Sequence, residues 1–393
     1  MDAKRQVAVV VERTNGYARE LIRGIADFAS SHPEIDFQLF DPDRFHLNRR
    51  APADGYICRV TSDAVARRLV RHGKPVVDLL CLRRHPGFAA VRPDVRALVD
   101  LAVTHFAERR FTRFAFCGFD TIHYSDIRRD AFADALRERG QTPEIYRTST
   151  AVRRRFSVRY QTTGSIDAPP DIRELEAWLG ALPKPIAVFC CDDFRAHQVA
   201  NLCRTRGIAV PNDVAVLGVD DDPVICTFSS PRLSSVDPNA FGIGRAAAES
   251  VVALMDGRTV DDVTYVPPKG IAVRESSECY PLDPPWMSDA LVFIRRQAAN
   301  GISAADVFAR LGLSHTTVQR AFRDVLKSSV QKEIIAARLD EARRLLIETD
   351  LSAVEVARQS GFAGVCYFTH AFTGAEKLSP LAYRQRHSSQ VGK

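Results

Sequence analysis

Apolar runs that alternate with amphipathic helical stretches constrain the fold of the first 275 residues. The helical stretches are 17–32, 62–73, 125–140 and 193–207, and the apolar runs around them are 6–11, 54–60, 74–81, 111–119, 184–191 and 213–220. Continuous apolar strands interleaved with helices are typical of parallel sheets that helices cover on both faces. The length of this part suggests two such lobes, with a ligand cleft between them at the carboxyl ends of the strands.

The pattern changes at a Pro-rich stretch, 275–289, which holds Pro281, Pro284 and Pro285 and is typical of a linker. No strand pattern follows it. Helices are instead predicted over 288–299, 303–310, 314–326, 330–348, 352–358, 364–374 and 380–385. The predicted organisation is a two-lobed α/β domain over 1–276, a linker over 277–287 and an all-α tandem helix-turn-helix domain over 288–387.

Positive charge gathers in the last part of the chain. Residues 288–393 hold 15 Lys and Arg against 10 Asp and Glu, and the net charge of the whole chain is +6. Five of the six excess positive charges therefore lie there. This asymmetry indicates an anionic partner for the helical part, with an ordinary solvated surface as the alternative.

Other bulk features point to a cytoplasmic protein that does not use a membrane. The N-terminal apolar run is too short for a signal peptide and predicts a strand, and no segment approaches the roughly 18 apolar residues that span a bilayer. The nine cysteines show neither CxxC nor Cys/His metal spacing. They are predicted to be buried reduced thiols, and no metal site is expected.

Residues 314–326 predict a helix with two unlike faces. Val318, Phe322 and Val325 share one face, and Ser314 is a good N-cap. Side chains suited to base edges and phosphates share the other face: Thr316, Gln319, Arg320 and Arg323. A short helix, a tight turn and such a second helix form a helix-turn-helix, which reads the DNA major groove. The alternative interpretation is an amphipathic surface helix without a DNA-binding role. A second unit of the same kind at 351–380 disfavours that interpretation.

The stretches "ARLDEARRLLIETDLSAVEVARQSGF", "YFTHAF" and "SPLAYRQ" lie at 337–362, 367–372 and 379–385. Through them the last hundred residues resemble the AraC/XylS family of transcription regulators. The matching positions are Arg338, Ala342, Leu345, Leu346, Thr349, Val356, Ala357, Gly361, Phe362, Tyr367, Phe368, Phe372, Ser379, Pro380, Tyr383 and Arg384. Most of these residues are structural: Gly361 gives the turn, and the phenylalanines fill a small core.

The resemblance implies base contacts from the second helix of each helix-turn-helix unit. The candidate DNA-binding residues are Thr316, Thr317, Gln319, Arg320, Arg323, Val365, Cys366, Thr369 and His370. The second of these helices has no Arg, Lys or Gln between Gly361 and Glu376, so the first is expected to carry most of the recognition. Both units place a lysine, Lys327 or Lys377, where the family turns on Gly. A left-handed turn costs a non-Gly residue about 1 kcal/mol, which a phosphate contact could offset.

The first part of the chain carries softer motifs: "RRDAF" at 128–132, "CDDFRAH" at 191–197, and "GVDD", "SPRLSSV" and "GRAAAESVVALMDG" within 210–257. In their order they resemble the sensor of the lactose-repressor (LacI/GalR) family, a relative of the periplasmic sugar-binding proteins. This sensor, joined to that DNA-binding part, is the layout of the xylose-responsive activators of enteric bacteria. The resemblance implies a periplasmic-binding-protein-like sensor for a sugar, with an aldopentose such as xylose favoured.

Sugar hydroxyls need carboxylates, amides and arginines, and an aromatic ring can stack on the sugar face. Candidates near the predicted strand ends are Glu12, Tyr17, Arg19, Asp94, Arg128, Asp193 and Asp220, with Tyr124 and Phe228 as further aromatic residues. A surface ion pair or a helix cap is the alternative for each residue alone. The run Asp220–Asp222 could suggest a cation, but it lacks other clustered ligands, so no metal is predicted.

An enzyme is the main alternative of another class. "GIGRAA", 242–247, matches G-x-G-x-x-A but does not follow a buried strand, so Gly244 is predicted to serve helix packing. No P-loop, G-x-S-x-G or H-E-x-x-H motif occurs. A sugar-transport receptor is disfavoured by the tandem helix-turn-helix and the N-terminus.

The sequence therefore predicts a sugar-responsive, sequence-specific transcription regulator without a cofactor. It is expected to activate a pentose operon as a homodimer, with promoter DNA, a sugar effector and RNA polymerase as partners. Another sugar or sugar acid as the effector, or a repressor role, remains the alternative.

Overall fold

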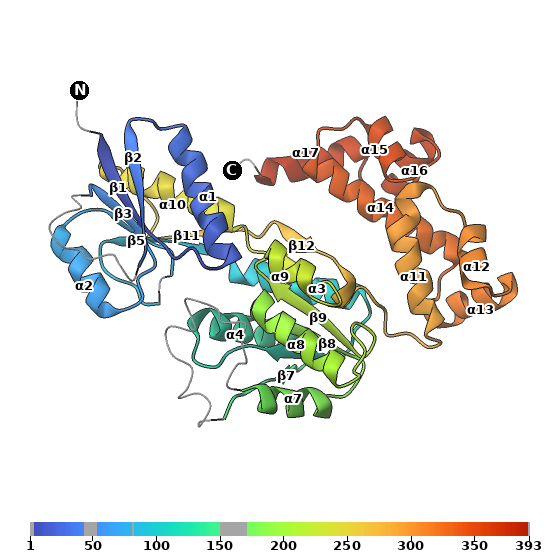
Figure 1. Cartoon of the computed structure of the whole chain (residues 1–393). Coiled ribbons are helices and arrows are strands. Elements are labelled where there is room, and N and C mark those ends of the chain that lie inside the picture. The colour runs from blue at the N-terminus through green and yellow to red at the C-terminus, as the bar shows by residue number, and fades with distance from the viewer. Residues whose placement is uncertain (1–3, 43–52, 81, 150–170, 392–393) are drawn as a thin grey trace. The chain divides into compact units, whose positions relative to one another are not determined.

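The computed structural model describes residues 4–42, 53–80, 82–149 and 171–391 (Figure 1). The chain divides into two compact units, Met1–Glu278 and Cys279–Lys393. The first unit alternates strands and helices in two lobes, and the second is helical. The predicted fold class, a two-lobed α/β domain of parallel sheets followed by an all-α part, is confirmed.

The first lobe is a parallel sheet in the order β11-β5-β4-β3-β1-β2. The strands are β1 (Arg5–Val10), β2 (Ile35–Phe40), β3 (Gly55–Cys58), β4 (Val76–Asp78), β5 (Phe88–Pro93) and β11 (Val263–Val266). Side chains alternate across β1: Val7 and Val9 enter one core cluster, and Ala8 and Val10 enter another. Helices α1 (Gly16–Ser30) and α10 (Ala240–Met255) cover the first face, and α2 (Asp63–His72) covers the second. Both faces are buried, which explains why the strand is apolar from Val7 to Val10.

Helices α1 and α10 approach each other closely at two glycines. A Cβ atom on Gly24 would lie 1.9 Å from the Phe241 carbonyl oxygen, and one on Gly244 would lie 2.0 Å from the Leu21 carbonyl oxygen. The "GIGRAA" motif therefore lies inside α10 and serves helix packing, as the sequence predicts.

The second lobe has the strand order β12-β10-β9-β8-β6-β7, in which β12 alone pairs antiparallel. The strands are β6 (Phe114–Cys117), β7 (Glu144–Ile145), β8 (Ile186–Cys190), β9 (Val214–Val219), β10 (Ser234–Asp237) and β12 (Gly270–Ala272). Its helices are α3 (Val95–Glu108), α4 (His123–Arg137), α7 (Ile172–Ala181), α8 (Asp193–Thr205) and α9 (Pro223–Phe228). The chain passes between the lobes three times, after β5, β10 and β11.

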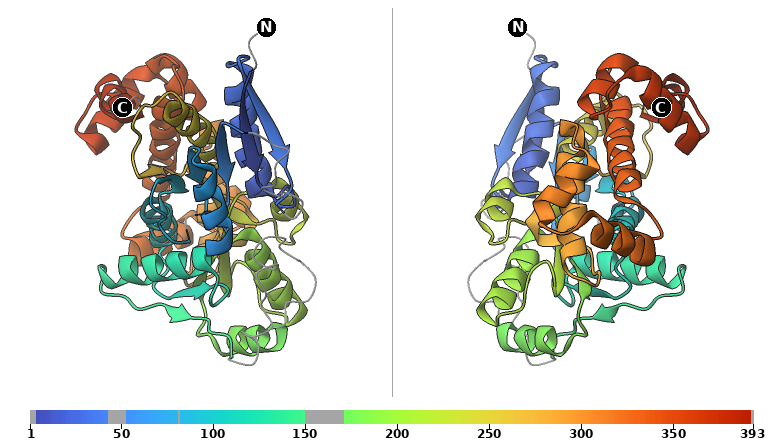
Figure 2. Two further views of the ribbon diagram at one scale, coloured as in Figure 1. Left: turned by 90° about the vertical axis from the view of Figure 1, so that its left-hand side faces the viewer. Right: turned by 90° about the vertical axis from the view of Figure 1, so that its right-hand side faces the viewer.

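The second unit consists of α11 (Trp286–Gln297), α12 (Ala304–Leu311), α13 (His315–Leu326), α14 (Val330–Glu348), α15 (Ala353–Gln359), α16 (Val365–Glu376) and α17 (Pro380–Val391). All seven predicted helices are confirmed. Two cores share the long helix α14: its first half packs with α11 to α13, and its second half packs with α15 to α17. Figure 2 shows α11 and α14 side by side.

Arg338 on α14 ties the two helix-turn-helix halves together. Its side chain is buried and donates hydrogen bonds to the carbonyls of Ala298 at 3.1 Å and Ile302 at 2.7 Å. Gly361 makes the predicted turn with φ +83°, and a Cβ atom there would lie 2.2 Å from the Ala298 carbonyl oxygen. The family signature residues at these positions therefore hold the domain together.

The buried face of α13 differs from the prediction at one residue, and residues of the Pro-rich stretch belong to the second unit. Val325 was predicted to join the buried face of α13, but it is 39% exposed, and Leu326 fills the core instead. The reason is the helical repeat: Val318, Phe322 and Leu326 are four residues apart and share the buried face of α13. In the Pro-rich stretch, Tyr280 packs in the core of the second unit, and α11 begins at Trp286.

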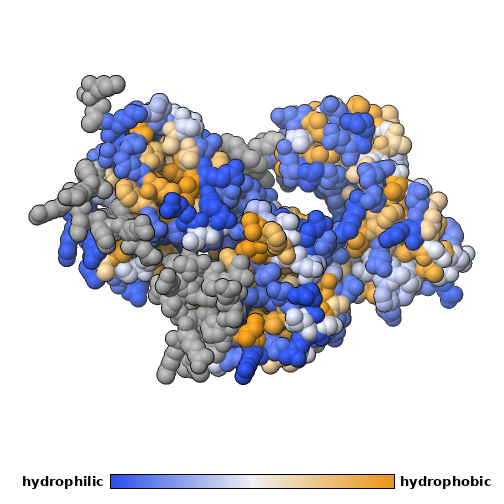
Figure 3. Space-filling model, in the orientation of Figure 1, coloured by the Kyte–Doolittle hydropathy of each residue, from blue (hydrophilic) through white to orange (hydrophobic). Residues whose placement is uncertain are grey.

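Hydrophilic residues predominate on the visible surface of both units, and apolar residues are scattered among them (Figure 3). Such single apolar residues are normal on a folded protein. Among the residues that the structure describes, no helix combines the length and the apolar character that crossing a membrane requires.

Candidate functional site

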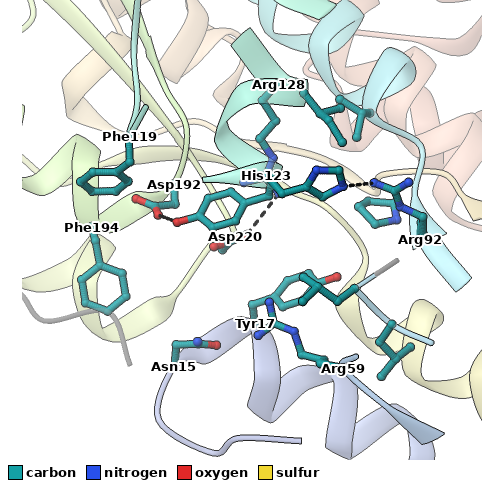
Figure 4. Close-up of a pocket in the computed structure, with 16 residues that line it drawn as sticks. Asn15, Tyr17, Arg59, Arg92, Phe119, His123, Arg128, Asp192, Phe194 and Asp220 are labelled. Atoms are coloured by element: carbon teal, nitrogen blue, oxygen red, sulfur yellow. Dashed lines mark hydrogen bonds and ion pairs between the residues drawn. The ribbon is translucent and has the colours of Figure 1, made fainter. Parts of the chain in front are cut away.

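A pocket lies between the two lobes of the first unit. Its wall takes residues at or just after the carboxyl ends of β3, β4 and β5 in one lobe and of β6, β8 and β9 in the other. The N-terminal parts of α1, α3, α4 and α8 complete it. Figure 4 shows these side chains converging on one space. The polar residues of the wall are Asn15, Tyr17, Arg59, Arg92, His123, Tyr124, Arg128, Asp192 and Asp220.

The buried Arg128 and the partly buried Asp220 lie at the centre of the polar wall. Nη2 of Arg128 lies 3.7 Å from Oδ1 of Asp220, and Nη1 donates to the Cys191 carbonyl. Burial raises the pKa of Asp220 to about 7, although the positive charge of Arg128 acts in the opposite direction. Near neutral pH this carboxyl group is therefore poised between its two protonation states.

Asp192 lies two residues after the end of β8 and is the N-cap of α8. Its Oδ2 accepts a hydrogen bond from the Tyr124 hydroxyl at 2.7 Å, and its Oδ1 caps α8 through the backbone N–H of Arg195 at 2.7 Å. The cap fixes the side chain in place. Burial raises the pKa of the Tyr124 hydroxyl well above its ordinary value, with the Asp192 carboxylate as the next cause. Tyr124 therefore stays protonated and keeps donating to Asp192.

Two phenylalanines, Phe119 and Phe194, supply apolar surface beside these carboxylates. The guanidinium carbon of the buried Arg195 lies 4.5 Å from the centre of the Phe119 ring, on the side where Arg195 pairs with Asp171. Aromatic rings next to fixed hydrogen-bonding groups suit a ligand with an apolar face and several hydroxyls.

Four of the predicted sugar residues line this pocket: Tyr17, Tyr124, Arg128 and Asp220. Glu12 does not line the pocket. It forms an ion pair with Arg59, whose side chain does line the pocket wall. Arg19 is half exposed and lies 3.5 Å from Asp222.

The other predicted residues lie elsewhere. Asp94 caps α3 through the Ala97 backbone N–H at 3.0 Å. Asp193 is buried outside the pocket wall, where it accepts hydrogen bonds from the Ser235 hydroxyl at 2.6 Å and the Asp222 backbone N–H at 2.8 Å. Phe228 is 84% exposed and does not line the pocket.

Sequence reasoning missed several wall residues: Asn15, Arg59, Arg92, Phe119, His123, Asp192 and Phe194. One signal was available, because Asp192 comes two residues after the last residue of β8 and Asp193 is already in α8. Arg59 and Arg92 lie at or just past strand ends, but nothing in the sequence says which of the many strand-end arginines point inward. Among the described residues, no group of three His, Cys, Asp or Glu side chains could hold a metal ion.

A second candidate site is the exposed face of α13 in the second unit. Ser314 caps the helix through the Thr317 backbone N–H at 3.2 Å, as predicted, and its hydroxyl lies 2.8 Å from that of Thr317. Thr316 is exposed, and the side chains of Arg320 and Arg323 are 76% and 73% exposed. Both arginines lie within 3.6 Å of Asp324, a weak exposed contact that a phosphate or guanine can replace.

The second helix of the other half, α16, presents a less polar face. Cys366 and His370 are exposed, Val365 and Thr369 are partly buried, and Tyr367 is 45% exposed. Lys327 and Lys377 adopt the predicted left-handed conformation at the ends of α13 and α16. The Nζ atom of each donates to the carbonyl three residues earlier, at 2.8 Å in both cases.

The chain matches two family models. Residues 103–277 match a periplasmic binding protein-like domain, and residues 307–386 match a helix-turn-helix domain. The first match covers most of the second lobe, and the second covers α13 to α16 completely.

Two curated relatives match almost the whole chain. The xylose operon regulatory protein of Haemophilus influenzae is 25% identical, with 96% of this chain and 98% of the relative covered. The protein of the same name from Escherichia coli K12 is 26% identical, with 98% of each covered. Both units therefore occur in the same order in these regulators.

Solved structures show the same fold. A xylose-binding transcription activator aligns with a TM-score of 0.61 at 23% identity, over 98% of this chain and 99% of that one. A LacI family regulator from Enterococcus faecium with bound ribose aligns with a TM-score of 0.56 at 20% identity, over 71% of this chain and 100% of that one. The relatives are regulators of transcription, and this chain is a regulator and not an enzyme. The chain belongs to the DNA-binding transcription regulators that join a periplasmic-binding-protein-like sensor for a small effector to an AraC-type helix-turn-helix domain.

Proposed function

We propose that the first unit binds a sugar in the pocket between its lobes and that this binding controls the regulator. The observation that carries the proposal is the Arg128–Asp220 pair beside Asp192, with a ring of Phe119 next to them. Carboxylates that accept from hydroxyls, an arginine that donates and an aromatic face are the groups that a sugar requires. Of the residues predicted from the sequence, Tyr17, Arg128 and Asp220 are proposed to contact it, and Glu12, Arg19, Asp94 and Asp193 to support the site.

The names of the full-length relatives favour an aldopentose such as xylose as the effector. Another sugar or a sugar acid is the alternative effector. Bound sugar would favour the closed arrangement of the two lobes, because its contacts come from both of them. Closure in the first unit would then change DNA binding by the second, which is an allosteric coupling between two sites.

The DNA-binding residues are proposed to be those on the outward faces of α13 and α16: Thr316, Thr317, Gln319, Arg320, Arg323, Val365, Cys366, Thr369 and His370. Each helix would enter one major-groove segment of a promoter. The exposed arginines of α13 support a larger share for the first half. Thr317 is proposed to contribute mainly through its cap contact with Ser314, which fixes the start of the reading helix.

Several finer assignments complete the proposal. The regulator acts in the cytoplasm as a homodimer and activates transcription through RNA polymerase, with repression as the alternative. The sensor occupies 1–276, a Pro-rich linker 277–287, and the DNA-binding domain 288–387. The packing of Tyr280 with the second unit places part of that linker close to the helical domain.

A thermal-shift screen of the full chain tests the sugar proposal. Pentoses, hexoses and uronic acids are added one at a time, and a ligand at 100 times its dissociation constant should stabilise the unit that binds it by about 2.7 kcal/mol. The variant Asp192→Asn should lose most of the response, and Asp100→Asn on the exposed face of α3 should keep it. A panel without any shift would contradict a sugar effector and leave the DNA-binding assignment untouched.

A further inference from the structure

The arginines of the pocket differ in their partners. Arg59 forms an ion pair with Glu12, and Arg128 lies 3.7 Å from Asp220. Arg92, which is the fifth residue of β5, is partly buried in the same wall. Two of the three arginines therefore have a carboxylate beside them before any ligand enters.

Arg92 lacks such a carboxylate. Its Nη2 atom lies 3.5 Å from Nε2 of His123, and within the described part of the chain it forms no ion pair. A guanidinium that is held in a partly buried wall without a counter-charge is a strong binding group for an anion, because desolvation strengthens its field. The planar fork of Arg92 suits two oxygens of one carboxylate.

The opposite side of the pocket carries the opposite charge. Asp192 accepts hydrogen bonds from Tyr124 and from the Arg195 backbone, both of which are neutral donors, and it forms no ion pair with a described residue. Figure 4 shows Asp192 and Arg92 on opposite sides of the drawn site. The wall is therefore divided into an acidic side for hydroxyl donors and a basic side for an acidic group.

We propose that the effector is a sugar with one carboxylate, such as a uronate, whose hydroxyls face Asp192 and Asp220 and whose carboxylate pairs with Arg92. This inference rests on the proposed function, since it names the class of sugar that the same pocket takes. It selects the sugar acid over the neutral aldopentose that the relatives' names favour.

The number of arginines without a carboxylate partner distinguishes a neutral sugar, a sugar carboxylate and a sugar phosphate as ligands. A neutral sugar would satisfy the acidic side but would leave Arg92 against uncharged oxygens. A sugar phosphate carries close to two negative charges, whereas one arginine of the three is without a carboxylate. One carboxylate matches one guanidinium, which leaves neither group as a buried unpaired charge.

Isothermal titration of the full chain with matched ligands tests the assignment. D-Glucose and D-galactose are compared with D-glucuronate and D-galacturonate, because each pair keeps the ring and changes one group at C6. D-Xylose and D-galactose 6-phosphate complete the panel. The uronate of at least one pair should bind ten or more times as tightly as its neutral partner, and a rise from 50 to 300 mM salt should reduce this preference.

Two variants of Arg92 and one control separate charge from fold. Arg92→Gln removes the charge and should abolish the tenfold preference, while Arg92→Lys keeps the charge and should retain most of it. Arg96→Gln is the matched control, because Arg96 is exposed on α3 and pairs with Glu138 and Asp100 away from the pocket. Unchanged melting of the ligand-free variants and unchanged affinity for promoter DNA establish that each variant is folded.

Each outcome has a distinct meaning. A uronate preference that Arg92→Gln removes and Arg92→Lys preserves supports the inference. Equal or tighter binding of the neutral sugars, tighter binding of the phosphate, or an Arg92→Gln variant that keeps the preference overturns it while the proposed sugar-sensing function stands. If no sugar and no sugar acid binds, the proposed function itself fails, and the inference fails with it.

Discussion

At the scale of single residues, the protonation state of Asp220 affects both the stability of the first unit and the charge of the pocket. Its pKa of about 7 arises chiefly from burial, with Arg128 as the opposing influence. An unfolded Asp has a pKa near 3.9. Because the folded value is the higher one, the stability that this group contributes is fully present below about pH 4 and is lost as the pH rises through about 7.

Effector affinity should have the opposite pH dependence. Ligand hydroxyls need the ionised carboxylate, so binding should be strongest above pH 8 and should weaken about tenfold for each unit that the pH falls below Asp220's pKa of about 7. Titration of the full chain between pH 5.5 and 8.5 measures this slope. Asp220→Asn should bind weakly with a flat profile. A slope that survives in Asp220→Asn would show that Asp220 is not the titrating group.

Arg320 gives a residue-scale prediction for DNA. Its side chain is 76% exposed and lies 3.6 Å from Asp324, so it is available for a base edge or a phosphate. Arg320→Ala should weaken promoter binding by about 1–3 kcal/mol and relax the preference at one base pair. Gel-shift titrations with a set of single-base variants measure both effects. Arg344→Ala is the control, because Arg344 pairs with Glu341 and Glu348 on α14. Equal losses in the two variants would remove Arg320 from the reading face.

At the scale of elements, the start of α1 and the start of α9 meet across the pocket. The backbone N–H of Gly16, the first residue of α1, donates to Oδ2 of Asp222 at 2.9 Å. Asp222 also caps α9 and belongs to the other lobe, and Arg19 lies 3.5 Å from it. This contact therefore joins the two lobes beside the pocket without being part of the pocket wall.

Gly16→Ala should disturb that contact. The added Cβ atom would lie 2.4 Å from Oδ2 of Asp222, so the lobes would have to separate slightly. Effector affinity should fall by about 5–150-fold, the usual range for a coupling between conformation and binding. Gly180→Ala on α7 is the control, because no atom lies within 4 Å of its added Cβ. Titration gives the affinities, and small-angle scattering compares the size of both variants with and without effector. Wild-type affinity in Gly16→Ala would show that the contact does not contribute to closure.

Gly361 provides the corresponding test in the helical unit. Its φ of +83° disfavours any side chain, and a Cβ atom would lie 2.2 Å from the Ala298 carbonyl oxygen. Gly361→Ala should therefore destabilise this unit by more than 1 kcal/mol, on the order of the left-handed penalty plus a clash. Gly364→Ala has open space around its Cβ and serves as the control. Chemical denaturation measures both variants, and equal midpoints would mean that the turn tolerates a side chain.

Some helices and strands of this chain can be predicted from the sequence, and others cannot. The helices of the second unit were predictable because N-caps such as Ser314 and helix-ending glycines such as Gly312 mark them locally. The predicted apolar runs do not include β2, β5, β7, β10, β11 or β12. Four of these strands, β7, β10, β11 and β12, have only two to four residues and carry too little pattern, and the longer β2 and β5 contain polar residues. The sequence predicts Asp193 as a sugar residue, whereas Asp192 is the one that lines the pocket. One residue decides whether a side chain enters the pocket or braces the loop behind it, and that depends on where β8 ends.

At the scale of the whole molecule, the two units have separate hydrophobic cores. The clusters around β1 and β8 use residues of the first unit, and those around α14 use residues of the second. Because none of these clusters contains residues of both units, we expect effector and DNA binding to be coupled without repacking of a common hydrophobic core. A regulator built in this way can keep its DNA-binding fold while its sensor changes conformation.

Scanning calorimetry of the full chain should show this division as two transitions. A domain of 150–250 residues shifts by about 2–4 °C for each kcal/mol, so effector at 100 times its dissociation constant should raise the sensor transition by several degrees. Promoter DNA should instead raise the transition of the helical unit. Asp192→Asn and Arg320→Ala should each reduce one of these shifts and leave the other, because each residue lies in a different unit. A single transition that both ligands raise equally would mean that the units unfold together, and effector binding would then have to reach the DNA-binding helices through one continuous fold.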